Sequence, residues 1–420
     1  MQKKPSISFP KKFLWGAATS AHQVEGNTHN QWSVWELENA KSKAAQATHQ
    51  FDDLDSWPHV QSEAVDPSSY VSGDGPDHYN LYAEDFDLLG KMNMNAFRFS
   101  VEWSRIEPNE GAWNAEAIEH YKRYVAELKK RNIEPIMTLF HFTLPTWFSA
   151  MGGFEKRKNV RYFIRFADKI VRELGMNIRF IITINEPEVY AAESYLHGNW
   201  PPNMTNKRVF LRVLNNLAYA HNRVADAIHA INRRYKISLA KNSCYFYAGD
   251  DSLLSRKSTD VMQYLQDDYF LKKVIKKCDF LGVNFYLSNR VYGYRIHNPE
   301  VKLSDMGWDL SPADVQHALE RLNDMYHLPI IITENGLADT RDANRQWWIT
   351  QTVMGMQKAM SNGVRLEGYL HWSLIDNFEW DKGIWPRFGL AAVDYETKER
   401  TLRPSALWFG KVIKRLRESQ

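Results

Sequence analysis

Eight short runs rich in β-branched and aromatic residues alternate along this chain with stretches whose apolar residues recur at helical spacing. A chain with this alternation buries its strands in a parallel sheet that helices cover. Eight repeats close such a sheet into a (β/α)8 barrel, or TIM barrel, and we predict an α/β fold of this kind. The predicted strands are residues 13–19, 96–101, 135–140, 180–184, 237–240, 280–285, 330–333 and 368–372. The predicted helices are residues 79–91, 115–131, 160–175, 207–235, 259–277, 311–326, 343–362 and 404–417.

An open, doubly wound sheet is the alternative architecture, and it is disfavoured because no Gly-x-Gly-x-x-Gly pattern follows the first predicted strand. No Gly/Ser-rich or Pro-rich linker divides the chain, so we expect a single domain over residues 1–420. Residues 38–67, rich in Ala, Gln, Ser and Asp, interrupt the alternation after the first strand. Loops at that position lie on the face where barrel enzymes build their active sites, so long active-site loops are expected.

The charge balance and the absence of apolar segments exclude several classes of protein. Lys and Arg number 53 against 50 Asp and Glu, and a net charge of +3 provides no basic surface for nucleic acid or an anionic membrane. Two cysteines exclude a disulfide framework and fit a reducing compartment. Residues 1–10 lack the apolar segment of a signal peptide, and no apolar run approaches the roughly 18 residues of a membrane span. These features predict a cytoplasmic protein, whose oligomeric state stays open.

Polar side chains occur at the carboxyl ends of the predicted strands, which are the ends that face the active site of a barrel. Two of them are carboxylates after β-branched runs, Glu186 after residues 181–184 and Glu334 after residues 330–333. Strand ends are often polar simply to meet water, but two carboxylates at one barrel mouth satisfy the requirement of glycoside hydrolysis. In that reaction one carboxylate attacks the acetal carbon and the other protonates the leaving oxygen. The other strand-end residues are Gln23, Arg98, His141, Asn185, Asn284, Tyr286, Asn335 and Trp372.

An ordered series of motifs over nearly the whole chain resembles glycoside hydrolase family 1, the β-glucosidase and β-galactosidase family. The motifs are FLWGAATSAHQVEG at residues 13–26, DHY at 77–79, YAED at 82–85, RFSVEWSRI at 98–106, TINEP at 183–187, IITENG at 331–336 and HWSLIDNFEW at 371–380. The resemblance implies a single catalytic TIM barrel that hydrolyses β-linked sugars with retention of configuration. It also implies that the enzyme needs no cofactor.

Matched residue by residue, the resemblance implies a role for each member of the catalytic group. Glu186 would act first as the general acid and then as the general base, and Glu334 would be the nucleophile that forms a glycosyl-enzyme. Asn185 would bond the sugar 2-hydroxyl, a contact that strengthens in the transition state. Tyr286 would orient the nucleophile by hydrogen bonding. Arg98 would place a positive charge beside Glu334 and favour its ionised form.

The resemblance assigns recognition of the non-reducing sugar to a second group of side chains. Hydroxyl contacts are expected from its polar members, stacking from Trp372 and contact with the far edge of the sugar from Trp380. Because neither His-Glu-x-x-His nor paired Cys-x-x-Cys accompanies His141, no metal is expected. The substrate-binding residues implied in this way are Gln23, His141, Asn284, Trp372, Glu379, Trp380 and Phe388.

Three departures from the family pattern concern the surroundings of the site. Phe142 stands where a Trp is common, so packing and specificity are expected to change more than activity. The Arg345-Gln-Trp-Trp348 block lacks the usual Tyr and the downstream His. The connection between Tyr286 and Asp305 is brief, which predicts a more open side for the leaving group and a broad tolerance of leaving groups.

Glu379 favours a neutral β-glucoside, β-galactoside or β-fucoside over a 6-phosphosugar, because its carboxylate would repel a phosphate. The expected partner is therefore a small β-glycoside or a short oligosaccharide. Two other functions fit the same family resemblance. A non-catalytic sugar-binding homologue is disfavoured because Glu186 and Glu334 are both present with Asn185 and Tyr286. A transglycosylase would use the same glycosyl-enzyme, and the residues do not separate it from a hydrolase.

Overall fold

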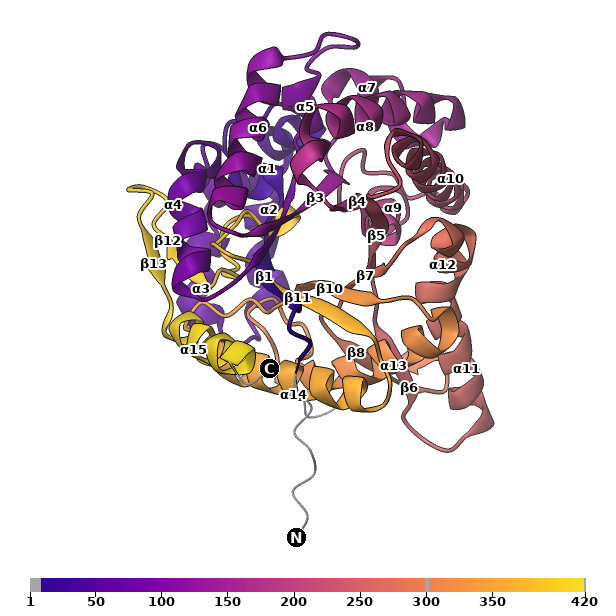
Figure 1. The fold of residues 1–420 in the computed structure, drawn as a ribbon. Helices are drawn as coiled ribbons and strands as arrows, with labels where there is room; N and C mark the ends of the chain where they lie inside the picture. Colours follow the sequence, from indigo (N-terminus) through magenta and orange to yellow (C-terminus); the bar gives the residue numbers. More distant parts are fainter. Residues whose placement is uncertain (1–8, 299–301, 419–420) are drawn as a thin grey trace.

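The computed structural model describes residues 9–298 and 302–418. Eight parallel strands close into a barrel in the order β1-β11-β10-β7-β5-β4-β3-β2, and helices surround them (Figure 1). The predicted TIM barrel is confirmed. The barrel strands are β1 (Leu14–Ala18), β2 (Ala96–Ser100), β3 (Glu134–Phe140), β4 (Phe180–Asn185), β5 (Lys236–Asn242), β7 (Leu281–Asn284), β10 (Ile330–Asn335) and β11 (Leu366–Trp372).

Every barrel strand overlaps one of the predicted runs, and the differences lie at the strand ends. β5 and β10 each continue two residues beyond the predicted runs, to Asn242 and Asn335. Both additional segments contain polar residues, which a hydrophobicity pattern assigns to a loop. They extend the barrel wall on the side where the functional side chains gather.

The outer helices agree with the prediction except at two places. The predicted helix over residues 207–235 ends at Ile231, because the Asn232 side chain accepts a hydrogen bond from the Arg234 backbone and turns the chain. The helix predicted over residues 259–277 begins earlier, because the Ser252 side chain caps its first turn. A short π-helix, Tyr264–Asp268, divides it into α11 and α12. The outer helices are α4 (His78–Lys91), α6 (Ala115–Lys130), α8 (Val160–Leu174), α10 (Lys207–Ile231), α11 (Leu253–Gln263), α12 (Tyr269–Val274), α13 (Val315–Tyr326), α14 (Arg345–Ser361) and α15 (Pro404–Glu418).

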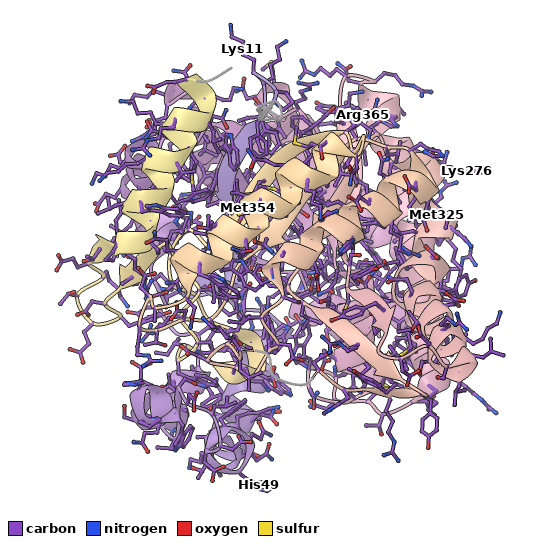
Figure 2. All side chains as sticks on the ribbon, turned by 90° about the horizontal axis from the view of Figure 1, so that it is seen from below. Lys11, His49, Lys276, Met325, Met354 and Arg365 are labelled. Carbon is purple, nitrogen blue, oxygen red and sulfur yellow. The ribbon has the colours of Figure 1, made fainter. Side chains whose placement is uncertain are left out.

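The segment over residues 38–67 is mostly helical and forms part of the long connection between β1 and α4. Asn30 caps α2 (Gln31–Phe51) through a capping box with Ser33, and α3 (Trp57–Ala64) follows. Figure 2 shows His49, near the end of α2, at the opposite end of the molecule from Lys11 and Arg365. Residues 11 and 365 precede β1 and β11, so α2 extends beyond the carboxyl ends of the strands, as expected for an active-site connection.

Smaller elements complete the described chain. One additional sheet contains β6 (Tyr245–Ala248), β8 (Ser288–Tyr292) and β9 (Arg295–Ile296), and another pairs β12 (Ala391–Val393) with β13 (Arg400–Leu402). In the described ranges, no helix combines the length and apolarity that crossing a membrane requires. Residues 1–8, on which the predicted lack of a signal peptide mostly depends, lie outside the described residues. Short helices over the barrel mouth are α1 (Ala21–Val24), α5 (Trp103–Ile106), α7 (Thr146–Ala150) and α9 (Pro187–Tyr195).

Small residues let neighbouring barrel strands approach closely. Gly16 on β1 lies opposite Ala96 on β2 and Leu370 on β11. A Cβ atom on Gly16 would lie 2.1 Å from the Ala96 carbonyl oxygen, a backbone atom that cannot move aside without shifting its strand. The buried side chains packed in one cluster through the barrel include Ala18, Ala96, Ile136, Phe180, Ile182, Ala240, Phe280, Ile331, Leu370 and Trp372.

We predict that Gly16→Ala lowers the free energy of unfolding by about 1–3 kcal/mol or more, because the added methyl group collides with backbone in a packed barrel. Gly90→Ala is the matched control, since Gly90 lies in α4 with nothing within 4 Å of an added Cβ atom. This control should leave stability unchanged or raise it by up to ~1 kcal/mol. Denaturation monitored by circular dichroism compares the two variants, and equal melting behaviour would contradict the packing argument.

Candidate active site

A pocket of about 310 Å³ opens at the carboxyl ends of the barrel strands. Nine of the twelve residues assigned from the sequence to catalysis or sugar binding line it, although they lie far apart along the chain. The other three, Gln23, Arg98 and Asn284, contact the lining residues from behind. The nine that line the pocket are His141, Asn185, Glu186, Tyr286, Glu334, Trp372, Glu379, Trp380 and Phe388.

Glu334, the second-last residue of β10, accepts hydrogen bonds from two strong donors. Arg98 donates from Nη1 to Oε1 at 2.5 Å, and the Tyr286 hydroxyl donates to Oε2 at 2.8 Å. Burial raises the pKa of Glu334, while the Arg98 charge and the Tyr286 hydrogen bond oppose that rise. The two contacts therefore stabilise the ionised form of Glu334 specifically and fix both carboxylate oxygens.

Glu186, at the junction of β4 and α9, has a different environment. Its backbone adopts the left-handed region at φ 39° and ψ 63°, an unusual conformation for a residue with a side chain. Its Oε1 accepts hydrogen bonds from Asn284 at 2.8 Å and from Asn242 at 3.1 Å. Burial raises the pKa of Glu186 to about 8, and the negative charge of Glu334 adds to this rise. This environment therefore favours the protonated form of Glu186.

The two carboxyl groups share one pocket, and burial raises the pKa of both, but only Glu334 has strong partners that oppose the rise. Glu334 has a guanidinium partner, whereas Glu186 has two neutral amides and a neighbouring negative charge. Two titratable groups whose environments separate their pKa values are the arrangement used by acid–base enzymes. The pocket can therefore present a nucleophilic carboxylate and a proton donor to one bound molecule.

Asn185 joins the two halves of this arrangement. Its Oδ1 accepts from Arg98 at 2.7 Å and from Asn284 at 3.1 Å, so the amide orientation is determined. Its Nδ2 then donates to Nε2 of His141 at 3.1 Å, which places the His141 proton on Nδ1. Burial, followed by the Arg98 charge, holds the pKa of His141 well below its usual value. His141 is therefore neutral, and its Nδ1 has no hydrogen-bond partner within residues 9–298 and 302–418.

Glu379 is a further carboxyl group that lines the pocket. Asn377 donates to its Oε2 at 2.9 Å and Gln23 donates at 3.3 Å. Burial raises the pKa of Glu379 to about 8. Gln23, expected to bind the sugar directly, is 1% exposed, lies behind Glu379 and also donates to the Phe378 carbonyl. In this structure Gln23 supports Glu379 and does not line the pocket.

Aromatic rings form one wall of the pocket. The His141 ring is nearly parallel to Trp372 at 20° and to Trp380 at 17°, with centroids 5.8 and 6.1 Å away. Phe142, the departure noted in the sequence, packs on Trp380 and Trp200 with centroids 5.1 and 5.0 Å away. Phe142 thus belongs to the wall and lines the pocket itself. Flat apolar faces of this kind suit the apolar faces of sugar rings.

Sequence reasoning missed nine further lining residues besides Phe142. For Asn242 a signal existed, because it ends β5 and the strand-end rule that identified Glu186 applies to it equally. The prediction stopped at residue 240 and therefore assigned no functional residue to the fifth strand. The others lie on helices and loops, whose position relative to the pocket is set by tertiary packing. The missed residues are Val189, Glu193, Asn199, Trp200, Asn242, Met306, Trp308, Asp381 and Lys382.

Comparison with known proteins gives consistent matches over the chain. The model of glycosyl hydrolase family 1 matches residues 5–284 and 272–418. Beta-glucosidase A of Thermotoga maritima is 28% identical, over 97% of this chain and 98% of that protein. A solved β-glycosidase from Pyrococcus horikoshii is 31% identical with a TM-score of 0.86, over 98% of this chain and 96% of that one. A Thermotoga maritima β-glucosidase solved in complex with glucoimidazole is 26% identical with a TM-score of 0.84, over 97% of this chain and 98% of that one.

We predict that Glu334→Gln lowers the pKa of Glu186 from about 8, because the substitution removes the nearby negative charge that disfavours ionisation. The measurement is an NMR titration of ¹³C-labelled glutamate carboxyl carbons, with the Glu186 signal assigned by its loss in Glu186→Gln. Glu379→Gln is the matched control, because Glu334 is the carboxylate with the largest effect on the pKa of Glu186 and Glu379 is not among the main causes of its shift. An unchanged Glu186 pKa in Glu334→Gln would show that the two carboxyl groups are not coupled.

Proposed function

The chain belongs to glycosyl hydrolase family 1, and we propose that it is a retaining β-glycosidase that releases terminal, non-reducing β-D-glycosyl residues as one catalytic domain. Glu334 is the nucleophile and Glu186 is the acid and base. The observation that carries this proposal is the difference between the partners of the two buried carboxyl groups in one pocket. Arg98 and Tyr286 favour an ionised Glu334, while Glu186 has only amide donors and lies near the negative charge of Glu334.

In the first step, an ionised Glu334 oxygen attacks the anomeric carbon and forms a covalent ester as the bond to the leaving oxygen breaks. Glu186 transfers its proton to that oxygen, so the alcohol leaves neutral. The hydrogen bond from Tyr286 keeps one carboxylate oxygen of Glu334 in place, and Arg98 holds the other. Because the site is ordered before substrate binds, little reorganisation is needed during the reaction.

In the second step, water enters from the face that the leaving group has vacated. Formation of the ester removes the negative charge of Glu334, which lowers the pKa of Glu186 and makes its carboxylate available as a base. Glu186 takes a proton from the water, the hydroxide attacks the anomeric carbon, and the ester bond breaks. Glu334 leaves as a carboxylate, and two displacements together retain the β configuration.

The recognition of a neutral sugar is supported by the polar side chains opposite the aromatic wall. Glu379 offers carboxyl oxygens and His141 offers an N–H group without a protein partner among the described residues. Because burial raises the pKa of Glu379, its carboxyl group can both donate to and accept from the hydroxyls of a neutral sugar, whereas a phosphate would be repelled by its ionised form. We therefore propose that the substrate is a neutral β-glucoside, β-galactoside or β-fucoside.

We predict that a 2-deoxy-2-fluoro-β-glucoside with a good leaving group inactivates the enzyme and adds one fluoroglycosyl group to the peptide that contains Glu334. The fluorine slows both steps, but the good leaving group spares the first, so the ester accumulates. Intact and peptide mass spectrometry detect the adduct. No adduct with this reagent or its galactose analogue would favour a sugar-binding protein, and an adduct on Glu186 would reverse the assigned roles.

We predict that Glu186→Ala lowers kcat/KM by about 10²–10⁴-fold for alkyl glucosides and much less for dinitrophenyl glucosides. Poor leaving groups need a proton, whereas a dinitrophenolate leaves without one. The kcat/KM values of both substrates are compared in the variant and the wild type. A loss of equal size for the two substrates would contradict the assignment of Glu186 as the acid.

A further inference from the structure

A buried group of charges lies directly behind Glu186. Lys241, on β5, is fully buried and places its Nζ 2.6 Å from Glu188 Oε1 and 3.5 Å from Asp267 Oδ1. Asp267 also accepts from Arg321 at 3.1 Å. None of these residues lines the pocket. A lysine and two carboxylates buried together are costly to desolvate, so a group that contributes only packing would be better filled by apolar side chains.

Asn242 connects this buried group to the catalytic pocket. Glu188 Oε1 accepts from the Asn242 backbone N–H at 3.0 Å while it also accepts from Lys241. The Asn242 side chain, which points to the other face of β5, donates to Glu186 Oε1 at 3.1 Å. Gln266 additionally donates to the Asn242 carbonyl at 3.0 Å. The backbone N–H and the carbonyl of Asn242 are therefore both hydrogen-bonded, and its side-chain amide donates to the Glu186 carboxyl group.

We propose that Glu188 and Asn242 are positioning residues that set the protonation of Glu186 in opposite directions, with Lys241 holding Glu188 in place. This inference rests on the proposed role of Glu186 as acid and base. The Asn242 amide stabilises the carboxylate form that the second step needs. The negative charge of Glu188, two residues from Glu186 along the chain, stabilises the protonated form that the first step needs.

The expected signs follow from the two interactions. Burial raises the pKa of Glu186 most, the charges of Glu334 and Glu188 raise it further, and the Asn284 and Asn242 hydrogen bonds lower it. Glu188→Gln removes a negative charge but keeps an oxygen for the Asn242 N–H, so the pKa of Glu186 should fall. Asn242→Ala removes a donor to the carboxylate, so the pKa should rise.

Other charged and titratable groups face Glu186 or its partners from the surrounding strands and loops, and both substitutions leave them in place. Their contributions therefore cancel when a variant is compared with the wild type. These groups are Arg98 on β2, His141 after β3, Lys241 on β5, Asp267 on the π-helix, Tyr286 after β7, Glu334 on β10 and Glu379 after β11.

The experiment compares wild type, Glu188→Gln and Asn242→Ala by the same carboxyl NMR titration and by the pH dependence of kcat/KM for an aryl glucoside whose leaving group is poor and needs the proton of Glu186. The alkaline limb of kcat/KM reports the loss of the Glu186 proton. We expect this limb and the titration midpoint to move by roughly one pH unit, downward in Glu188→Gln and upward in Asn242→Ala. Glu173→Gln, which also breaks lysine ion pairs but on α8, is the matched control and should move neither.

Opposite shifts in the two variants would support the inference, because general loss of structure moves both in one direction or lowers kcat without moving the limb. Unchanged midpoints, or shifts of the same sign, would overturn it. If the wild type does not hydrolyse aryl glucosides, the proposed function fails, yet the NMR midpoints still decide whether Glu188 and Asn242 control Glu186. Each variant tests its own direction, so one that folds poorly does not prevent the test with the other.

Discussion

The ion pair between Arg98 and Glu334 is the interaction on which the rest of the site depends. Arg98 is 1% exposed, and the two groups come from β2 and β10, which are separated in the barrel by β1 and β11. Removal of one partner would leave an uncompensated buried charge, a cost of roughly 3–5 kcal/mol. The pair therefore requires a closed barrel, and the closed barrel in turn excludes the water that would weaken it.

The same ion pair determines the behaviour of the neighbouring groups. Arg98 compensates the charge of Glu334, whereas Glu186 has only amide donors, and burial together with the charge of Glu334 raises its pKa. Arg98 also directs the oxygen of Asn185 toward itself, and Asn185 in turn orients His141. The buried guanidinium of Arg98 thus compensates the charge of Glu334 and fixes the orientation of Asn185 and, through it, of His141. The difference in protonation between the two carboxyl groups is a property of this network.

Hydrophobic periodicity was sufficient to predict the barrel, since each strand alternates with a helix long enough to show its period. It failed where polar side chains carry the local signal. The cap at Ser252 starts α11 before its apolar pattern begins, and Asn242 extends β5 beyond its last apolar residue. The motif that contains Gln23 gave no sign that its amide donates to Glu379 and to the Phe378 carbonyl, and its predicted contact with the sugar stays a prediction. A sequence motif thus identifies a residue near the pocket without showing which hydrogen bonds its side chain makes.

The sequence by itself determined the order of strands and helices and the identity of the two carboxylates, because apolar periodicity and motifs are local along the chain. Only the tertiary structure decided that Arg98 reaches Glu334 and that Asn242 reaches Glu186. It also decided that Lys241 and Glu188 form a buried pair close to Glu186. The physical reason is that burial and charge compensation depend on distances between segments far apart in sequence. The sequence therefore shows which residues carry a carboxyl group, whereas the pKa of each group depends on the neighbours that the closed barrel brings to it.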